Sequence, residues 1–321
     1  MQATSIFDPV QDRLQDVGDS LTGMAVDRFP YLSTLLDHIF ATPGKRVRPA
    51  LTLLASNFHD HDERITHAMA TAVELLHIAT LIHDDTVDDS DLRRGRATVS
   101  NLWGGNAAVL VGDYLFAASA TFVCDTVDVR VIKRFAETIM KLSAGELQEM
   151  SVSFSPDQSM ETYLERIYNK TASLFTTAGE SGALLSGAGD ATVRALKDYS
   201  CNLGMAFQIV DDILDFDGTE EEIGKPVGND LLHGIITLPT LLAMRRHPHS
   251  TLISDFFRNR EDTGLLQEAI SFIGDASVIE EAYQVAKEYS SKSLEALSTI
   301  PANPSRDALE ELVGFVTVRR T

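Results

Sequence analysis

The feature that most limits the fold of this 321-residue chain is a series of long segments whose apolar residues recur at helical spacing. The alternation typical of β-strands is nearly absent. Short connectors with proline or glycine separate these segments, and no low-complexity linker divides the chain. We therefore expect one all-α domain over residues 1–321. Its clearest helices are expected at residues 65–85, 106–124, 129–150, 160–185, 191–216 and 278–298.

One segment, residues 68–82, is apolar almost all the way round the helix. Such a helix is expected in the centre of a bundle and not on its surface. It runs directly into His83, Asp84 and Asp85, and buried carboxylates are costly unless a cation meets them. We therefore expect this end of the helix to lie at the mouth of a cavity.

These carboxylates belong to the first of two Asp-Asp-x-x-Asp clusters, at residues 84–88 and 211–215. A carboxylate stripe on an apolar helix predicts a site for hard divalent metals, which usually hold substrate phosphates. An acidic helix end with counter-ions is the alternative, and it explains one cluster better than two matching ones. In the second cluster, one helical face carries Gln208, Asp211, Asp212 and Asp215.

Basic residues form two groups, although the chain is strongly acidic, with 27 Lys and Arg against 47 Asp and Glu. Arg is the preferred ligand for phosphate oxygens, and Lys binds phosphate as a point charge. Together with the metal site, these groups predict two anions bound side by side, one through metal and one directly. Salt bridges from Arg93 and Arg94 to the aspartates are the alternative. The groups are Lys45, Arg46 and Arg48, and Arg93, Arg94 and Arg96.

The formal charge of −20 argues against a nucleic-acid partner and against tight binding to anionic lipid, but it permits loose membrane contact. Cys124 and Cys201 lack metal-ligand spacing, so we expect free thiols in a reducing compartment. We find no signal peptide, and no run approaches the roughly 18 apolar residues of a membrane span. A soluble, cytoplasmic protein without a transmembrane segment is expected.

As a set, these motifs resemble those of the trans-type isoprenyl diphosphate synthases, the polyprenyl synthetase family. The resemblance covers most of the chain. One Asp-rich cluster also occurs in class I terpene cyclases, but two clusters with Lys-Arg-x-Arg and Arg-Arg-Gly elements are far more specific. The matching segments are residues 44–49, 81–88, 91–95, 105–108, 112–113, 170–175, 207–215, 224–226 and 237–239.

The resemblance implies a helical bundle around a deep central cavity, a homodimer, and transfer of an allylic diphosphate's prenyl group to isopentenyl diphosphate. About three Mg²⁺ would bridge the two clusters and the allylic diphosphate, with Asp84, Asp88 and Asp211 as ligands. Further ligands or their partners would be Asp85, Asp212 and Asp215. The allylic diphosphate would be bound by Arg93, Lys170 and Lys225. Isopentenyl diphosphate would be bound by Lys45, Arg48, His77 and Arg94.

The implied chemistry is ionisation, condensation and elimination. Magnesium and lysine would stabilise the departing pyrophosphate, which would then remove the final proton. Thr171 and Gln208 would stabilise the allylic cation through neutral oxygen dipoles. Each has a plainer alternative, because Thr171 can bond within its helix and Gln208 can serve in packing. His77 taken alone would be a core histidine.

Product length would be set below the first cluster, by Leu76, Ala79 and Thr80. These positions lie roughly 6 to 12 Å down the helix from Asp84. Because Ala79 is small, we expect a product of about C30–C50, the precursor of a quinone side chain. A floor at Leu115, Phe116 or Phe122 would shorten it.

Two rival functions and one departure from the family pattern follow from the same comparison. The first rival is a short-chain synthase that makes geranylgeranyl or farnesyl diphosphate. The second is a catalytically weak partner subunit of a heteromeric prenyl synthase. Residues 231–236 lack the lysine that contacts diphosphate in many members, so we assign them no role.

Overall fold

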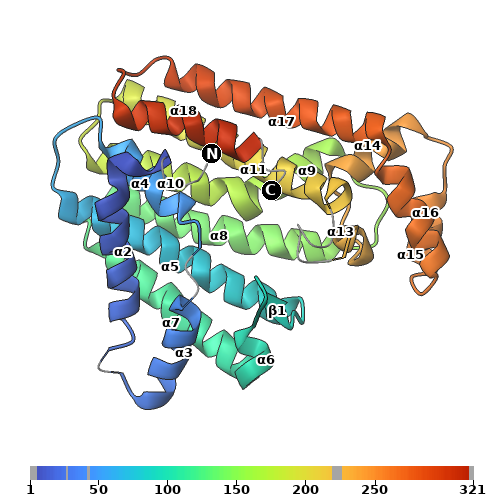
Figure 1. Cartoon of the computed structure of the whole chain (residues 1–321), viewed down its shortest axis with the longest axis horizontal. Coiled ribbons are helices and arrows are strands. Elements are labelled where there is room, and N and C mark those ends of the chain that lie inside the picture. Colours follow the sequence, from blue (N-terminus) through green and yellow to red (C-terminus); the bar gives the residue numbers. More distant parts are fainter. Residues whose placement is uncertain (1–5, 27, 42–43, 219–225, 318–321) are drawn as a thin grey trace. The chain divides into compact units, whose positions relative to one another are not determined.

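The computed structural model describes residues 6–26, 28–41, 44–218 and 226–317, and helices account for most of them (Figure 1). The all-α expectation is therefore confirmed. The chain forms two compact units. The first comprises Met1–Ala136, Leu174–Ser200 and Leu297–Leu312, and the second comprises Glu137–Ser173, Cys201–Ala296 and Val313–Thr321. The expectation of a single domain stays a prediction.

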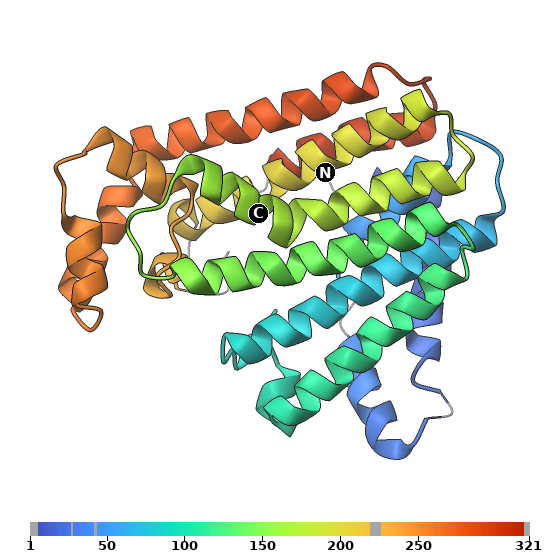
Figure 2. The same cartoon turned by 180° about the vertical axis from the view of Figure 1, so that it is seen from behind.

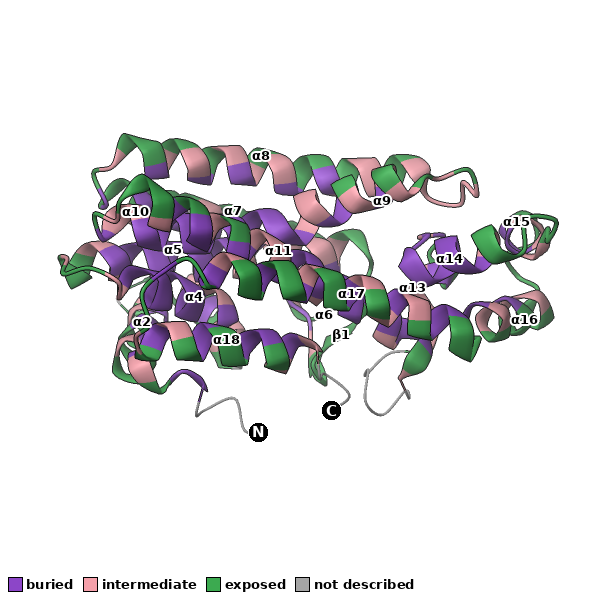
Figure 3. Cartoon of the chain, turned by 90° about the horizontal axis from the view of Figure 1, so that it is seen from above, coloured by how far each residue is buried: buried purple, intermediate pink, exposed green. Residues whose placement is uncertain are grey.

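The first unit is built around α5 (Glu63–Val87), the helix whose residues 68–82 were expected to be central. Asp62 begins it, because its side chain accepts a hydrogen bond from the backbone N–H of Arg64 at 3.0 Å. Leu75, Leu76 and Ala79 have no exposed surface. The helix packs along α7 (Gly105–Cys124) and α4 (Val47–Ser56) (Figure 2). In Figure 3, α4 and the first half of α5 are coloured largely as buried.

The first unit contains further elements besides α4, α5 and α7. They are η1 (Asp8–Val10), α2 (Gln11–Gly23), α3 (Pro30–Phe40), β1 (Leu92–Arg93), β2 (Arg96–Ala97), α6 (Val99–Trp103), most of α10 (Ser173–Leu185) and of α18 (Pro304–Thr317), and the first parts of α8 (Val129–Val152) and α11 (Asp190–Asp217).

β1 and β2 form a two-stranded antiparallel hairpin that the sequence did not predict. Arg94 and Gly95 make its turn, with φ of 51° and 74°. Positive φ at both central positions matches the twist of a tight hairpin. The hairpin follows directly on the first aspartate cluster and holds Arg93 beside it.

The second unit contains the remaining parts of α8 and α11 together with the C-terminal helices. Its core includes Ile209, Ile213, Leu238 and Phe256, each with no exposed surface. The other elements are α9 (Met160–Ile167), η2 (Tyr168–Ala172), α13 (Asn229–Leu232), α14 (Leu238–Arg246), α15 (Leu252–Arg258), α16 (Thr263–Ile273) and α17 (Ala276–Leu297).

Five of the six predicted helices agree with α5, α7, α8, α11 and α17 to within two residues at each end. The sixth, expected as one helix over residues 160–185, is instead interrupted by a π-helical turn, η2, between α9 and α10. Such turns are rare and often occur at functional sites. The interruption places Lys170 and Thr171 in a widened turn.

Two helices, α5 and α7, are each long and apolar enough in composition to cross a membrane. This corrects the expectation that no segment approaches such a length. Within the most apolar window, 67% of α5 is buried in the protein, as in the core helix of a soluble protein, but only 33% of α7.

Candidate functional site

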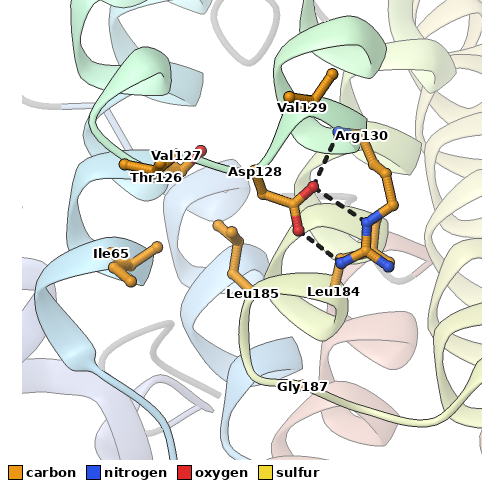
Figure 4. A pocket seen from close by; sticks show the side chains of 9 residues that line it. All are labelled: Ile65, Thr126, Val127, Asp128, Val129, Arg130, Leu184, Leu185 and Gly187. Carbon is orange, nitrogen blue, oxygen red and sulfur yellow. Dashed lines mark hydrogen bonds and ion pairs between the residues drawn. The ribbon is translucent and has the colours of Figure 1, made fainter.

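A pocket of about 500 Å³ in the first unit lies where the connection from α7 to α8 meets α5 and the end of α10 (Figure 4). Asp128 and Arg130 form an ion pair of 2.6 Å at its side. No residue predicted to bind substrate or metal lines this pocket, so it is not the catalytic cavity expected from the sequence. Its lining is Ile65, Thr126, Val127, Asp128, Val129, Arg130, Leu184, Leu185 and Gly187.

The first aspartate cluster forms the end of α5, and its three carboxylates have different surroundings. Asp85 is buried, and Arg93 Nε donates a hydrogen bond to its Oδ1 at 2.7 Å. Burial raises the pKa of Asp85, and the charge of Arg93 opposes this rise. Asp84 is half-buried and Asp88 is exposed. The predicted salt-bridge alternative is therefore present between Arg93 and Asp85.

Arg48 and His77, predicted to act together, are in direct contact. Arg48 Nη1 lies 3.1 Å from His77 Nε2, and the guanidinium stands 4.6 Å from the centre of the Phe175 ring. A guanidinium can only donate, so Nε2 accepts and the imidazole proton is on Nδ1. Burial lowers the pKa of His77 well below its usual value, and the charges of Arg48, Arg94 and Arg93 lower it further. His77 is therefore neutral.

Arg94, a predicted phosphate ligand, approaches the backbone at Gly44, which directly precedes a second predicted ligand, Lys45. A Cβ atom at residue 44 would lie 3.0 Å from Arg94 Nη1, so glycine allows the guanidinium to approach the backbone next to exposed Lys45. Arg46 points elsewhere, because its Nη1 donates to the backbone oxygen of Leu14 at 3.1 Å. This contact with α2 makes Arg46 a structural residue.

The second aspartate cluster lies near the C-terminal end of α11 and also contains both buried and exposed carboxylates. Asp211 is exposed, whereas Asp212 and Asp215 are buried. Asp215 Oδ2 accepts a hydrogen bond from the backbone N–H of Asp230 at 3.0 Å. This contact ties the start of α13 to α11.

Asp212 belongs to a chain of hydrogen bonds that contains two further predicted residues. Thr171 Oγ1 donates to Gln208 Oε1 at 2.6 Å, and Gln208 Nε2 donates to Asp212 Oδ1 at 2.8 Å. The hydroxyl of Tyr163 donates to Asp212 Oδ2 at 2.7 Å. Burial is the main cause that raises the pKa of Asp212 to about 8, with a further contribution from Asp230. Tyr163 was not singled out from the sequence, where it is one aromatic residue of an amphipathic helix.

Lys170 is held by two carboxylates of α8 that the sequence reading also missed. Its Nζ lies 3.0 Å from Glu146 Oε1 and 2.6 Å from Glu149 Oε1. A Cβ atom at residue 145 would lie 3.0 Å from the backbone nitrogen of Lys170, so Gly145 lets α8 pass close to the π-helical turn. A pair of glutamates three residues apart was the only sequence signal.

The residues predicted to set product length lie on α5 as expected. Leu76 and Ala79 have no exposed surface, and Thr80 is half-buried. The hydroxyl of Thr80 donates to the backbone oxygen of His77 at 2.8 Å. The centre of the Phe116 ring, a candidate floor, lies 5.3 Å from the centre of the His83 ring.

Lys225 lies outside the described residues. Within the described part of the chain, no three His, Cys, Asp or Glu side chains are gathered as ligands of one ion. The predicted ligands Asp84 and Asp88 belong to the first unit and Asp211 to the second. All three offer carboxylate oxygens, which are the hard donors that Mg²⁺ prefers.

Comparison with known proteins gives a consistent family assignment. Residues 29–273 match the family model described as polyprenyl synthetase. The chain is 37% identical to a prenyl transferase of Synechocystis over 99% of both chains, and 37% identical to heptaprenyl diphosphate synthase component 2 of Geobacillus stearothermophilus, again over 99% of both. It also superposes, with a TM-score of 0.93 and 35% identity, on a polyprenyl synthase from Caulobacter crescentus complexed with calcium and isoprenyl diphosphate. That match covers 100% of this chain and 98% of the other.

Proposed function

The chain belongs to the polyprenyl synthetase family, and from this premise we propose that it extends an allylic diphosphate with isopentenyl diphosphate to give an all-trans polyprenyl diphosphate. The observation that carries the proposal is that both aspartate clusters contain buried as well as exposed carboxylates. In each cluster, buried carboxylates are fixed by neighbouring groups, while Asp88 and Asp211 face solvent.

We assign Asp84, Asp88 and Asp211 as ligands of about three Mg²⁺, as in the sequence prediction. The family is metal-dependent, and one relative of known structure is complexed with calcium and isoprenyl diphosphate. When bound, the metal would neutralise the allylic diphosphate and favour its departure as pyrophosphate. The other three carboxylates already accept hydrogen bonds within the protein. Asp85 accepts from Arg93, Asp212 from Gln208 and Tyr163, and Asp215 from the backbone N–H of Asp230. These contacts support a positioning role for all three.

We assign the diphosphate of isopentenyl diphosphate to Lys45, Arg48, His77 and Arg94. The neutral His77 fixes one Arg48 nitrogen and keeps its own Nδ1 proton as a donor. The stacked Phe175 ring limits where the Arg48 guanidinium can move. The allylic diphosphate is assigned to Arg93, Lys170 and Lys225.

We propose a medium or long product of about C30–C50, a precursor of a quinone side chain. Ala79 is fully buried and small, which favours a deep tunnel. The relative named a heptaprenyl diphosphate synthase component supports this range. A short-chain synthase is the alternative, and Phe116 beside His83 is the observation that favours it.

We also propose that the protein acts in the cytoplasm as a homodimer. α7 is among the most apolar helices of the described chain, yet only 33% of its apolar window is buried. Val109 and Leu110 are 45% and 69% exposed on it. A second copy would cover this face. Because one relative is named as a component, a weakly active subunit of a heteromeric synthase is the alternative.

One assay of the purified protein tests these proposals. Farnesyl diphosphate, labelled isopentenyl diphosphate and Mg²⁺ should give a ladder of products that ends at about C30–C50. Chelation of the metal should abolish incorporation, and Asp84→Asn or Asp211→Asn should lower turnover by about a thousandfold or more. Asp89→Asn, which changes a neighbouring exposed carboxylate, should not.

The contrary outcomes separate the alternatives. No incorporation by the isolated wild-type protein would contradict the proposed activity and would favour the partner-subunit alternative. Termination at C20 would favour a short-chain synthase that makes geranylgeranyl diphosphate, and incorporation with geranyl but not with farnesyl diphosphate would favour one that makes farnesyl diphosphate. Near-normal turnover of Asp84→Asn would overturn the metal assignment.

A further inference from the structure

A chain of three hydrogen bonds links four side chains of the second unit. In order they are Thr171 on η2, Gln208 and Asp212 on α11, and Tyr163 on α9, joined at 2.6, 2.8 and 2.7 Å. Thr171, Asp212 and Tyr163 are buried, and Tyr163 has no exposed surface. Buried hydrogen bonds of this kind fix orientation, because any broken contact leaves a polar group without water.

The donors and acceptors in this chain allow one direction when Asp212 is ionised. The carboxylate then accepts at both oxygens, so the Gln208 amide turns its NH₂ group toward Oδ1. The amide oxygen then faces Thr171, which must donate its hydroxyl proton to it. The lone pairs of Thr171 Oγ1 are left for any other neighbour.

Tyr163 completes this arrangement at its far end. With Gln208 at Oδ1 and Tyr163 at Oδ2, both oxygens of Asp212 are held, and the carboxylate cannot rotate. Without the tyrosine hydroxyl, Oδ2 would lie buried without a donor. Rotation of Asp212 and reversal of the Gln208 amide would then become accessible, and a reversed amide would offer its NH₂ group to Thr171.

We propose that Tyr163 is a positioning residue for prenyl transfer, which acts through Asp212 and Gln208 to keep the proton of Thr171 turned away from the reacting carbon. This inference rests on the proposed function, in which Thr171 and Gln208 stabilise an allylic cation. An oxygen lone pair stabilises such a cation, whereas a hydroxyl proton directed at it destabilises it. The direction of the hydrogen-bond chain thus decides whether Thr171 helps or hinders ionisation.

The test compares two buried tyrosines. Tyr163→Phe should lower kcat by about tenfold or more, with the KM values of both substrates changed by less than about twofold, because it affects the reacting state and not diphosphate binding. Tyr199→Phe is the matched control. Its hydroxyl is equally buried and donates to the backbone oxygen of Leu309 at 2.7 Å, so the same bond is lost in the first unit, and kcat should be unchanged.

A double-mutant cycle separates positioning from general destabilisation. In a Thr171→Val background, the hydroxyl that Tyr163 is proposed to orient is absent. Adding Tyr163→Phe should therefore lower kcat by less than about twofold more. If Tyr163→Phe does not fold, Asp212→Asn takes its place. An amide at residue 212 can donate to Gln208 and reverse the chain, so it should reproduce the loss of kcat.

Each outcome decides the inference. A full tenfold loss from Tyr163→Phe in the Thr171→Val background, an equal loss in Tyr199→Phe, or a change confined to KM would overturn it. An unchanged kcat in Tyr163→Phe, with active wild-type protein, would overturn it and leave the proposed function intact. A wild-type protein without prenyl transfer would instead contradict the proposed function itself.

Discussion

At the scale of single residues, neighbouring identical side chains have different chemistry because they differ in burial and in hydrogen-bond partners. Asp84 and Asp85 are adjacent in sequence, yet only Asp85 is buried, and it accepts a hydrogen bond from Arg93. Asp211 and Asp212 differ in the same way, since only Asp212 is held by Gln208 and Tyr163. Helical spacing predicts which carboxylates share a face, but it does not predict which partner reaches each of them.

The neutral His77 should make stability depend on pH. Burial holds its folded-state pKa below the 6.5 of a free imidazole, so on acidification the unfolded chain takes up a proton that the folded chain excludes. Stability from this site is complete above about pH 6.5 and falls by up to about 1.4 kcal/mol per pH unit below it, until the folded-state pKa is reached. Denaturant unfolding between about pH 5 and 7.5 measures this slope.

His77→Gln is the informative variant, because glutamine keeps an acceptor for Arg48 and does not titrate. We expect its unfolding free energy to fall less steeply on acidification than that of the wild type. His249→Gln, which removes an exposed histidine, should keep the wild-type slope. Identical slopes for His77→Gln and wild type would contradict a neutral His77 with a lowered pKa.

At the scale of elements, the π-helical turn η2 joins Lys170 to Thr171 and depends on the close approach of α8. Gly145→Ala would place a Cβ 3.0 Å from the Lys170 nitrogen and 3.1 Å from Asn169 Cβ. The backbone must then shift, so we expect a loss of about 1–3 kcal/mol of stability and a clear loss of turnover. Gly23→Ala at the end of α2 meets nothing within 4 Å and should preserve both. Thermal melts and the prenyl transfer assay compare the two, and equal behaviour would contradict the role of this approach.

The same elements show what the sequence could predict. Periodicity placed α5, α7, α8, α11 and α17 correctly, because long apolar stripes depend on local spacing. It missed η2, since a π turn keeps helical composition and changes only the register. It also missed the β1–β2 hairpin, where strands of two residues are too short to show alternation. Lys170 and Thr171 were identified through family motifs, whereas Tyr163, Glu146 and Glu149 are recognisable only from their contacts.

At the scale of the whole molecule, the exposed apolar face of α7 predicts assembly. Leu110 is 69% exposed on a helix apolar enough to be a core helix, so Leu110→Glu should convert a dimer into monomers. Light scattering coupled to gel filtration measures the mass. Leu232→Glu, at a residue 42% exposed on α13, is the matched control and should leave the mass unchanged. A monomeric wild-type protein, or a dimeric Leu110→Glu variant, would contradict assembly through this face.

Product length is also a property of the whole molecule, because a growing chain must find room below the first aspartate cluster. Ala79 lies on α5, five residues before Asp84, and has no exposed surface. Ala79→Phe would add an aromatic ring at that depth, and we expect the longest product to shorten by several isoprene units while the first condensation continues. Mass spectrometry of the products with farnesyl diphosphate as primer measures both. Ala72→Phe, seven residues nearer the start of α5 and also without exposed surface, is the control for overpacking. Unchanged products from a folded, active Ala79→Phe variant would contradict the position of the tunnel and direct attention to Phe116.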